Sequence, residues 1–575
     1  MRLSLSKSKN ATSLYVIKDV IEKNKRTTKI VEKLGTITEL QKELNGQDPI
    51  EWAKKYIEEL NKKEKEENRN IIVKYSPSKL INKDEQHSFN GGYLFLQKIY
   101  HELGLHKICK EISQKYKFDF DLNSILSRLI YGRIIFPSSK LATHQLSKKF
   151  IEQPNFDLHQ IYRSLEVLAK ETDFIQSSLY ENSLKVSKRN TGVLYYDCTN
   201  YFFEIEQEDG LKQYGFGKDH KPNPIVEMGL FMDGDGIPLA FSIHSGNTNE
   251  QTTLRPLEEK ILKDFELSKV IVCTDAGLSS TENRKFNDKQ NRAFITTQSI
   301  KKLKKHLKQW ALASTGWHLS GSKETYDISL LDYDEKSYEK YKSQTFYKQR
   351  WIKEDGLEQK LIITYSLKYR DYQKQIRNRQ LERAAKLIEN RPSNIKKKSQ
   401  NDYKRFISST NVTKNGEVAD KAIYSLNEKA IADEEMYDGF YGICTNLDGD
   451  ATEIIKVNHR RWEIEECFRI MKSEFKARPV YLSRDDRIEA HFNTCFIALI
   501  IYRLLEKRVN EDFTCHEIIS ELREMNFKKV RGEGYEPLYT RTDFTDALHE
   551  AFGFRTDYQI VSTQNMKKIF KDTKR

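Results

Sequence analysis

Two apolar segments of this chain are each interrupted by one aspartate, and this feature constrains the fold most. "VLYYDCTNYFFEI", which begins at residue 193, has Asp197 in its middle, and "KVIVCTDAG", which begins at residue 269, carries Asp275 near its end. Both segments are rich in β-branched or aromatic residues and predict strands. Functional groups of open α/β sheets gather at strand ends, so the two acids predict a site there. The alternative is that each acid only caps a turn.

The segments around these strands predict a mixed sheet. "IVEMGLFMDGDGIPLAFSIHSG" contains two strand patterns around a D-G-D-G turn and predicts a hairpin. "QTTLRPLEEKILKDF" has helical periodicity, and "RAFITT" at 292–297 predicts one more short strand. Strand, hairpin, helix, strand, helix and strand in this order indicate a mixed α/β sheet rather than a doubly wound parallel one.

The chain has 575 residues, which is too long for a single core, and its pattern changes several times along the sequence. We expect a small basic α+β unit at 1–89, a helical DNA-binding domain at 90–190, a first part of the catalytic core at 191–297, a β-rich insertion at 298–440, a second part of the core at 441–510 and a C-terminal region at 511–575.

The charge and cysteine content narrow the function classes. Lys and Arg exceed Asp and Glu by 97 − 84 = 13, and this excess favours a polyanionic partner, with nucleic acid as the first candidate. The seven cysteines form no C-x-x-C pair, so neither a disulfide framework nor a thiolate zinc site is indicated. The N-terminus has no apolar signal core and the longest apolar run, at 495–505, is short, so we expect a cytoplasmic protein without a membrane span.

A third acid lies in "RWEIEECFRIMK" at 461–472. Wound as one helix, this segment puts Arg461, Glu465 and Lys472 on one stripe beside an apolar face. Alone, an Arg and a Glu four residues apart usually form a solvated helix pair. Together with the two strand aspartates, Glu465 predicts an oxygen-only ligand set, which suits Mg²⁺ or Mn²⁺, and two such ions can promote phosphoryl transfer.

The order of elements and the D…D…E set resemble the RNase H-like core of DDE transposases. The segment 461–472 resembles the Y-R-E-K signature of one large group of bacterial insertion-sequence transposases. Arg461, Glu465 and Lys472 fit its spacing, whereas the tyrosine position falls on Asn458. In that group a mostly β insertion separates the second Asp from the Glu, in agreement with the long interval here, 465 − 275 = 190 residues.

The resemblance implies specific roles for these residues. Asp197, Asp275 and Glu465 would be catalytic and bind the divalent ions, while Arg461 and Lys472 would bind phosphates of the DNA end. It also implies binding of terminal inverted repeats, cleavage of the element ends, joining of the 3′-OH to target DNA, and a homodimer in the DNA complex. Two alternatives stay open: an inactive, transposase-derived DNA-binding protein, and an RNase H-like nuclease that does not join ends.

Overall fold

The computed structural model describes residues 1–8, 11–22, 25–44, 47–67, 71–73, 76–267, 269–289, 291–390, 402–412 and 418–575. It divides into two compact units, Met1–Glu85 and Gln86–Arg575. Each unit has its own core and is described by itself.

The N-terminal unit combines a sheet with two helices. Its antiparallel sheet has the order β1-β2-β3, and the helices follow β3 in the chain. Leu14, Leu40 and Ala53 are buried between them. A capping box between Thr36 and Glu39 ends β3 and begins the first helix. The elements are β1 (Arg2–Lys7), β2 (Thr12–Glu22), β3 (Lys25–Thr36), α1 (Ile37–Glu43) and α2 (Pro49–Glu67).

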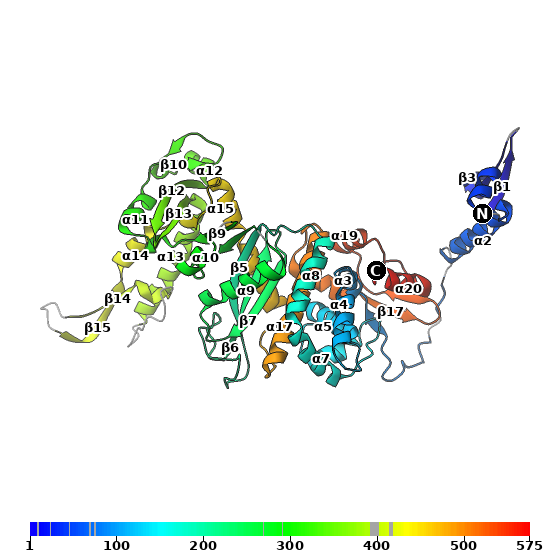
Figure 1. Cartoon of the computed structure of the whole chain (residues 1–575), viewed down its shortest axis with the longest axis horizontal. Coiled ribbons are helices and arrows are strands. Elements are labelled where there is room, and N and C mark those ends of the chain that lie inside the picture. Colours follow the sequence, from blue (N-terminus) through cyan, green and yellow to red (C-terminus); the bar gives the residue numbers. More distant parts are fainter. Residues whose placement is uncertain are drawn as a thin grey trace. The chain divides into compact units, whose positions relative to one another are not determined.

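The centre of the second unit is an RNase H-like sheet, as the sequence predicts (Figure 1). Its strands have the order β7-β6-β5-β8-β9. The first three strands of this sheet along the chain, β5, β6 and β7, are antiparallel neighbours, whereas β8 and β9 run parallel to β5. The strands are β5 (Val193–Phe202), β6 (Ile225–Asp233), β7 (Pro238–Ser245), β8 (Val270–Thr274) and β9 (Arg292–Thr297).

Helices cover this sheet on both faces. On one face, α9 (Glu250–Asp264) buries Leu254 and Leu257 against Tyr196 of β5, and Asn249 caps the start of that helix. A short helix, α10 (Thr281–Phe286), follows β8. The other face packs against helices from the C-terminal half of the chain, so odd-numbered residues of β5 face those helices.

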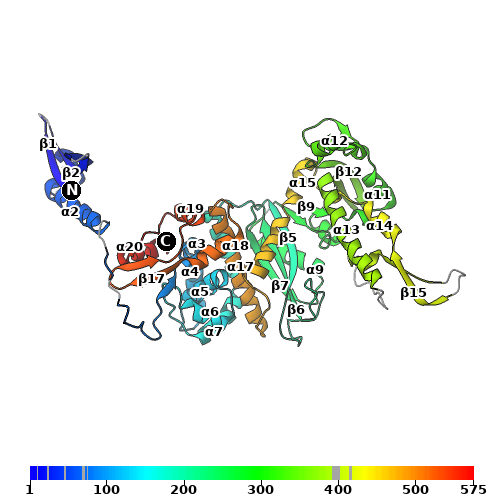
Figure 2. The same ribbon diagram turned by 180° about the vertical axis from the view of Figure 1, so that it is seen from behind.

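The insertion extends the same sheet rather than forming a separate one. β16 pairs with both β9 and β13, so the full sheet has the order β11-β10-β12-β13-β16-β9-β8-β5-β6-β7 (Figure 2). The segment expected to be β-rich is mixed α/β, since helices flank its strands. Its elements, with β16, are α11 (Lys305–Leu312), β10 (Trp317–Leu319), β11 (Thr325–Tyr326), α12 (Glu335–Tyr341), β12 (Phe346–Glu354), β13 (Leu357–Tyr365), α13 (Leu367–Glu389), β14 (Ile407–Val412), β15 (Val418–Leu426), α14 (Glu428–Glu435) and β16 (Phe440–Thr445).

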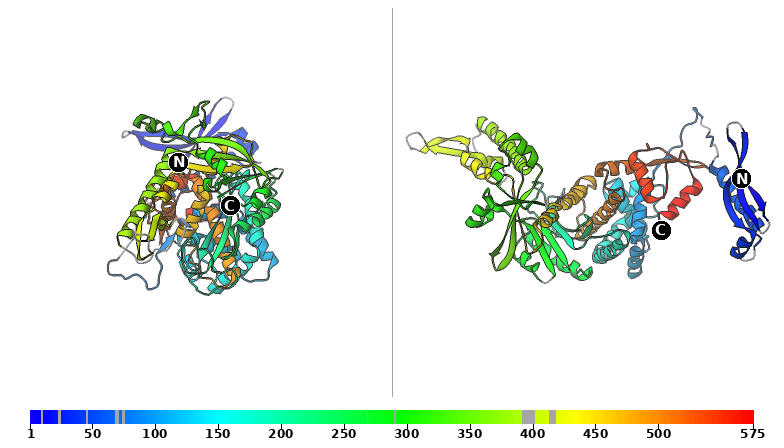
Figure 3. Two further views of the ribbon diagram at one scale, coloured as in Figure 1. Left: turned by 90° about the vertical axis from the view of Figure 1, so that its left-hand side faces the viewer. Right: turned by 90° about the horizontal axis from the view of Figure 1, so that it is seen from above.

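The helical segment that follows the N-terminal unit shares its core with the end of the chain. Its helices pack around α17, and β4 pairs with β17, so in Figure 3 the light-blue and cyan helices of this segment lie beside the orange and red elements of the C-terminal region. The elements are β4 (Ser88–Asn90), α3 (Tyr93–Glu102), α4 (Leu105–Lys115), α5 (Leu122–Ile135), α6 (Lys140–Ser147), α7 (Leu158–Lys170), α8 (Thr172–Val186), α15 (Ala451–His459), α16 (Trp462–Arg469), α17 (Asp485–Arg508), α18 (Cys515–Glu524), β17 (Asn526–Val530), β18 (Gly534–Pro537), α19 (Asp543–Phe552), β19 (Val561–Ser562) and α20 (Thr563–Asp572).

The helix α17 is central to this core. Within the part of the chain that the structure describes, it is the one helix long and apolar enough to cross a membrane by length and composition. However, 94% of its most apolar window is buried inside the fold, as in the core helix of a globular protein. Its apolar character is therefore accounted for by its contacts with α3, α5 and α7.

Candidate active site

Asp197 lies at the middle of β5, between β6 and β8. Strand alternation puts it on the same face as Tyr195 and Thr199, toward the C-terminal helices, while Tyr196 and Cys198 face α9. The backbone N–H of Cys198 donates a hydrogen bond to Asp197 Oδ1 at 2.8 Å. The carboxylate thus stands on the most central strand of the RNase H-like sheet.

Asp275 directly follows β8, at the end where this strand leaves the sheet. One of its oxygens does cap a turn, since Leu278 N–H donates to Asp275 Oδ1 at 2.9 Å. Gly277 is also part of this turn, and a Cβ there would lie 3.3 Å from the same oxygen. The turn interaction accounts for one oxygen only, and the charge of Asp275 also acts on Asp197.

The two strand aspartates repel each other. Burial raises the pKa of Asp197 to about 6, and the charge of Asp275 adds to this increase. Lys218 and Arg461 oppose it, because cations favour the ionised carboxylate. A pair of facing carboxylates with this electrostatic cost is typical of sites that act on a ligand rather than of structural positions.

Arg461 links the third acid to this pair. Burial disfavours its charge, but Tyr441, Glu465, Asp197 and Asp275 together outweigh this effect and raise the pKa of Arg461. Its guanidinium lies 3.1 Å from the Glu465 carboxylate, whose side chain is 57% exposed. The three predicted carboxylates therefore all interact with one guanidinium.

The donor chemistry of these acids fits a divalent, oxygen-preferring cation, which would relieve the repulsion between the two aspartates. As they stand, however, no three His, Cys, Asp or Glu side chains of the described residues are grouped so that they could hold a metal ion. Instead, Arg461 supplies positive charge beside all three carboxylates. The assignment of Asp197, Asp275 and Glu465 as metal ligands stays a prediction.

The segment expected to be one continuous helix is divided into three parts. Arg461 precedes α16 as its N-cap residue, and after Arg469 the chain continues as a π-helix over Ile470–Glu474. The Phe475 N–H accordingly donates to the Ile470 carbonyl, five residues back, at 2.9 Å. This wider turn changes the direction of the side chains after α16, so the single stripe of an ideal helix is not formed.

Lys472 lies in this π-helix and points toward β5. Its Nζ donates to the Thr199 hydroxyl at 2.7 Å and lies 5.4 Å from the centre of the Tyr201 ring. Burial lowers the pKa of Lys472 to about 8, and repulsion by Lys218 adds to this decrease, while Glu227 and Asp197 oppose it. A partly buried lysine beside the strand carboxylate is thus present where the sequence predicts a DNA contact.

Asn458, at the tyrosine position of the signature, is buried at the end of α15. Its Nδ2 donates to the Tyr441 hydroxyl at 3.3 Å. Tyr441 comes from β16, and its hydroxyl also lies 2.6 Å from Thr297 Oγ1. A phenol is therefore present beside Arg461, but it comes from a different element than the sequence pattern suggests.

Lys218, Glu227 and Glu250 are site residues that the sequence reasoning missed. Glu227 is on β6, Glu250 begins α9, and Lys218 comes from the segment between β5 and β6. Lys218 and Lys472 both interact with Asp197 and with Glu227. The polar "GKDH" at 217–220 has no periodicity, so only the fold could place it here.

Comparison with protein families gives the decisive observation. A family model described as "Transposase DDE domain" matches residues 202–359 and 355–501, which together span more than half of the chain. The chain belongs to this family. Asp275, Arg461, Glu465 and Lys472 fall within the matched segments of this DDE transposase, while Asp197 lies just before the first of them.

Two further comparisons concern curated proteins and solved structures. Among curated proteins, none matches the sequence of this chain. Among solved structures, a chain described as "Cryo-EM structure of piggyBac transposase synaptic complex with hairpin DNA" is similar, with a TM-score of 0.35 and 8% sequence identity, over 84% of each chain.

Proposed function

We propose that this DDE transposase is the enzyme of a bacterial insertion sequence of the Y-R-E-K group and acts in the cytoplasm, on nucleoid DNA. It would bind the terminal inverted repeats of its element, cleave the ends and join the 3′-OH ends to target DNA. One observation carries the proposal: Asp197, Asp275 and Glu465 all interact with the Arg461 guanidinium, and the partly buried Lys472 interacts with Asp197. The net charge of +13 supports a DNA partner.

Asp197, Asp275 and Glu465 would hold divalent ions, Mg²⁺ or Mn²⁺, in this mechanism. When bound, these ions supply the charge that activates an attacking oxygen and stabilises the leaving oxygen. Oxygen ligands without a His or Cys cluster suit these metals.

Arg461 and Lys472 would bind the DNA backbone. Arg461 neutralises the carboxylates without a ligand, and it would be free to contact a phosphate once a cation takes over this role. Lys472 is held by Thr199 at the edge of the same site, where its ammonium can reach a phosphate next to Asp197. A homodimer in the DNA complex, each site acting on one end, belongs to the same proposal.

The full chain, incubated with DNA that carries the inverted repeats flanking its gene, tests the proposal. We expect cleavage at the repeat ends and joined products in Mg²⁺, and neither product with a chelator. Cleavage without joined products would favour the nuclease alternative. Binding without cleavage would favour the inactive DNA-binding protein.

Lys472→Ala should separate DNA binding from cleavage chemistry. Loss of one phosphate contact should weaken the hold on the cleaved end by about tenfold and lower the salt dependence of binding, while metal binding stays largely intact. Fluorescence anisotropy with pre-cleaved end DNA measures this effect. Lys456→Ala, which removes an exposed lysine of α15, is the matched control and should bind normally.

A further inference from the structure

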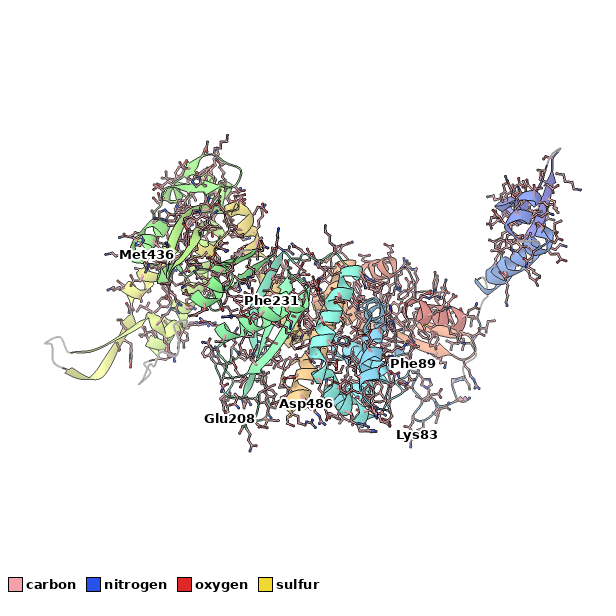
Figure 4. All side chains as sticks on the ribbon, in the orientation of Figure 1. Lys83, Phe89, Glu208, Phe231, Met436 and Asp486 are labelled. Atoms are coloured by element: carbon pink, nitrogen blue, oxygen red, sulfur yellow. The ribbon has the colours of Figure 1, made fainter. Side chains whose placement is uncertain are left out.

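The segment between β5 and β6 folds back onto β5 and brings Lys218 beside Asp197. Lys218 Nζ donates to the Cys198 carbonyl at 2.6 Å and lies 3.2 Å from the Glu250 carboxylate. Its charge also favours the ionised form of Asp197. In Figure 4, Glu208 of the same segment lies at the periphery of the unit, whereas Phe231 of β6 lies within it.

Backbone contacts fix Lys218 in this position. Its own N–H donates to Asn200 Oδ1 at 3.1 Å, and Asn200 Nδ2 donates to the Phe216 carbonyl at 3.2 Å. Asp219, the next residue, forms an ion pair with Arg478. The lysine is thus held from both sides by elements that also form the catalytic centre.

Two cations meet at consecutive residues of β5, since Lys218 Nζ donates to the Cys198 carbonyl and Lys472 Nζ to the Thr199 hydroxyl. Lys218 and Lys472 come from opposite ends of the core sequence and repel each other beside Asp197. Glu250 forms an ion pair with Lys218. Burial and a hydrogen bond with Glu250 raise the pKa of Glu227 to about 8, and the two lysines oppose this increase. Glu227 is only 3% exposed, and its Oε1 has no hydrogen-bond partner among the described residues. Two ammonium groups on adjacent residues of one strand provide a site for a single anionic group that contacts both.

Both ammonium groups retain the capacity for such a ligand. A lysine has three donors, and Lys218 uses two of them, toward Cys198 and Glu250, in the contacts that the described chain makes. Lys472 makes one hydrogen bond, to Thr199. The side chain of Lys218 is 39% exposed, so a backbone phosphate can reach it from solvent.

We propose that Lys218 and Lys472 together bind one phosphate of the DNA strand next to Asp197, and that Glu250 and Glu227 position Lys218. This inference rests on the proposed function and adds a DNA-contacting residue from a segment outside the signature helix. Two lysines on one phosphate fix the strand from two directions, so the bond to be cleaved is held against the carboxylate pair.

The test compares phosphate and methylphosphonate DNA, because a methylphosphonate linkage removes the charge of one phosphate. Terminal-repeat duplexes would carry one such linkage at the cleaved position or at either neighbouring position. Binding would be measured with a chelator, so that no cleavage occurs. For unmodified DNA we expect Lys218→Met to bind about tenfold more weakly, with a salt slope reduced by about one. At one methylphosphonate position, wild type and variant should bind equally.

Lys218→Met keeps the length and apolar stem of the side chain, and its thermal unfolding would be compared with that of wild type. Lys218→Arg is the second variant and should retain most of the affinity, because it keeps the charge. Lys221→Ala removes an exposed lysine of the same segment that lies over the Phe202 ring, and is the matched control.

The outcomes separate this inference from the proposed function. If wild-type protein does not bind the repeats, the proposed function fails. If wild type binds but Lys218→Met behaves like Lys221→Ala, or keeps its defect at all three methylphosphonate positions, the shared phosphate is wrong. If Lys218→Met is unstable, the affinity of Lys218→Arg for DNA is compared with that of Lys221→Ala instead. Near-normal binding by Lys218→Arg supports a phosphate contact made through the charge of residue 218, and a tenfold loss of affinity contradicts it.

Discussion

Two aspartates of the same sheet, Asp233 and the partly exposed Asp197, have opposite surroundings. Asp233, at the end of β6, is fully buried and pairs with Arg189, whose Nε lies 2.6 Å away. Its other oxygen accepts the N–H groups of Asp235 and Ile237 at 3.0 and 2.9 Å. Asp197 has one backbone donor, and the charge of Asp275 disfavours its ionised form.

The difference shows how burial alone can mislead. A buried carboxylate whose oxygens are all satisfied stabilises a turn, and Asp233 holds the hairpin between β6 and β7 in this way. The partly buried Asp197 carboxylate has an electrostatic cost, because burial and the charge of Asp275 both disfavour its ionised form. We infer that Asp197 is kept for a ligand and Asp233 for the fold, and each prediction below tests that distinction.

Asp197→Asn should have the largest effect, and it should be on activity. Replacing even the outer partners of a metal site commonly costs 10–100-fold, so loss of a direct ligand should lower cleavage of terminal-repeat DNA by more than about 100-fold. DNA binding should be retained, because the change removes a negative charge near phosphates. Near-normal cleavage by this variant in Mg²⁺ would show that Asp197 is an ordinary strand residue.

Asp233→Ala should instead affect stability. It leaves the Arg189 guanidinium buried and unpaired, and such breakage typically costs about 3–5 kcal/mol of unfolding free energy. Urea unfolding measures the loss. Asp235→Ala is the control in the same turn; it removes only an acceptor for the Asn190 N–H and should cost about 1 kcal/mol. Equal losses in the two variants would contradict a structural role for the Arg189–Asp233 pair.

Asp197 should contribute a defined part of the pH dependence of stability, which comparison with Asp197→Asn isolates. Its pKa is about 6 in the folded chain and about 3.9 in an unfolded one, so the unfolded chain ionises this group first. Relative to Asp197→Asn, the metal-free wild type should therefore lose roughly 3 kcal/mol as the pH rises from about 4 to about 6. Unfolding in urea with a chelator, at pH 4, 5, 6 and 7, measures this. A wild type that gains stability over that range relative to the variant would reverse the argument.

Glu465→Gln should give the smallest change in stability and yet a large loss of cleavage. The carboxylate is more than half exposed and its pair with Arg461 spans one helical turn, so its removal should change the unfolding free energy by less than about 0.5 kcal/mol. Cleavage should fall by orders of magnitude while DNA binding stays the same or tightens. Glu466→Gln, which removes the partner of Arg469 on the same helix, should cleave normally.

The sequence was sufficient for the core of this fold, because strand and hairpin patterns are local. The order of strands and helices along the chain in the RNase H-like core is as predicted, and Asp197 and Asp275 lie within a strand and directly after one. The i,i+4 pair of Arg461 and Glu465 also follows from helical spacing. Such features depend on residues that are neighbours in the chain.

Features that depend on distant residues could not be predicted. The π-helix that turns Lys472 toward Thr199 has no signature in "IMKSE", since it results from packing. The approach of Lys218 to Asp197 depends on contacts with Asn200 and Arg478. The extension of the sheet by insertion strands depends on pairing between β13 and β16, far apart in the sequence.

That strand pairing has an evolutionary consequence. β13 and β16 are neighbours in the sheet, with Tyr365 opposite Phe440, so the chain leaves the sheet and returns to it at adjacent points. Everything between these two residues can therefore lengthen, shorten or be exchanged without moving β16, the strand that leads to Glu465. A lineage could acquire new DNA-end or partner specificity by replacing this excursion alone, while the catalytic geometry is inherited unchanged.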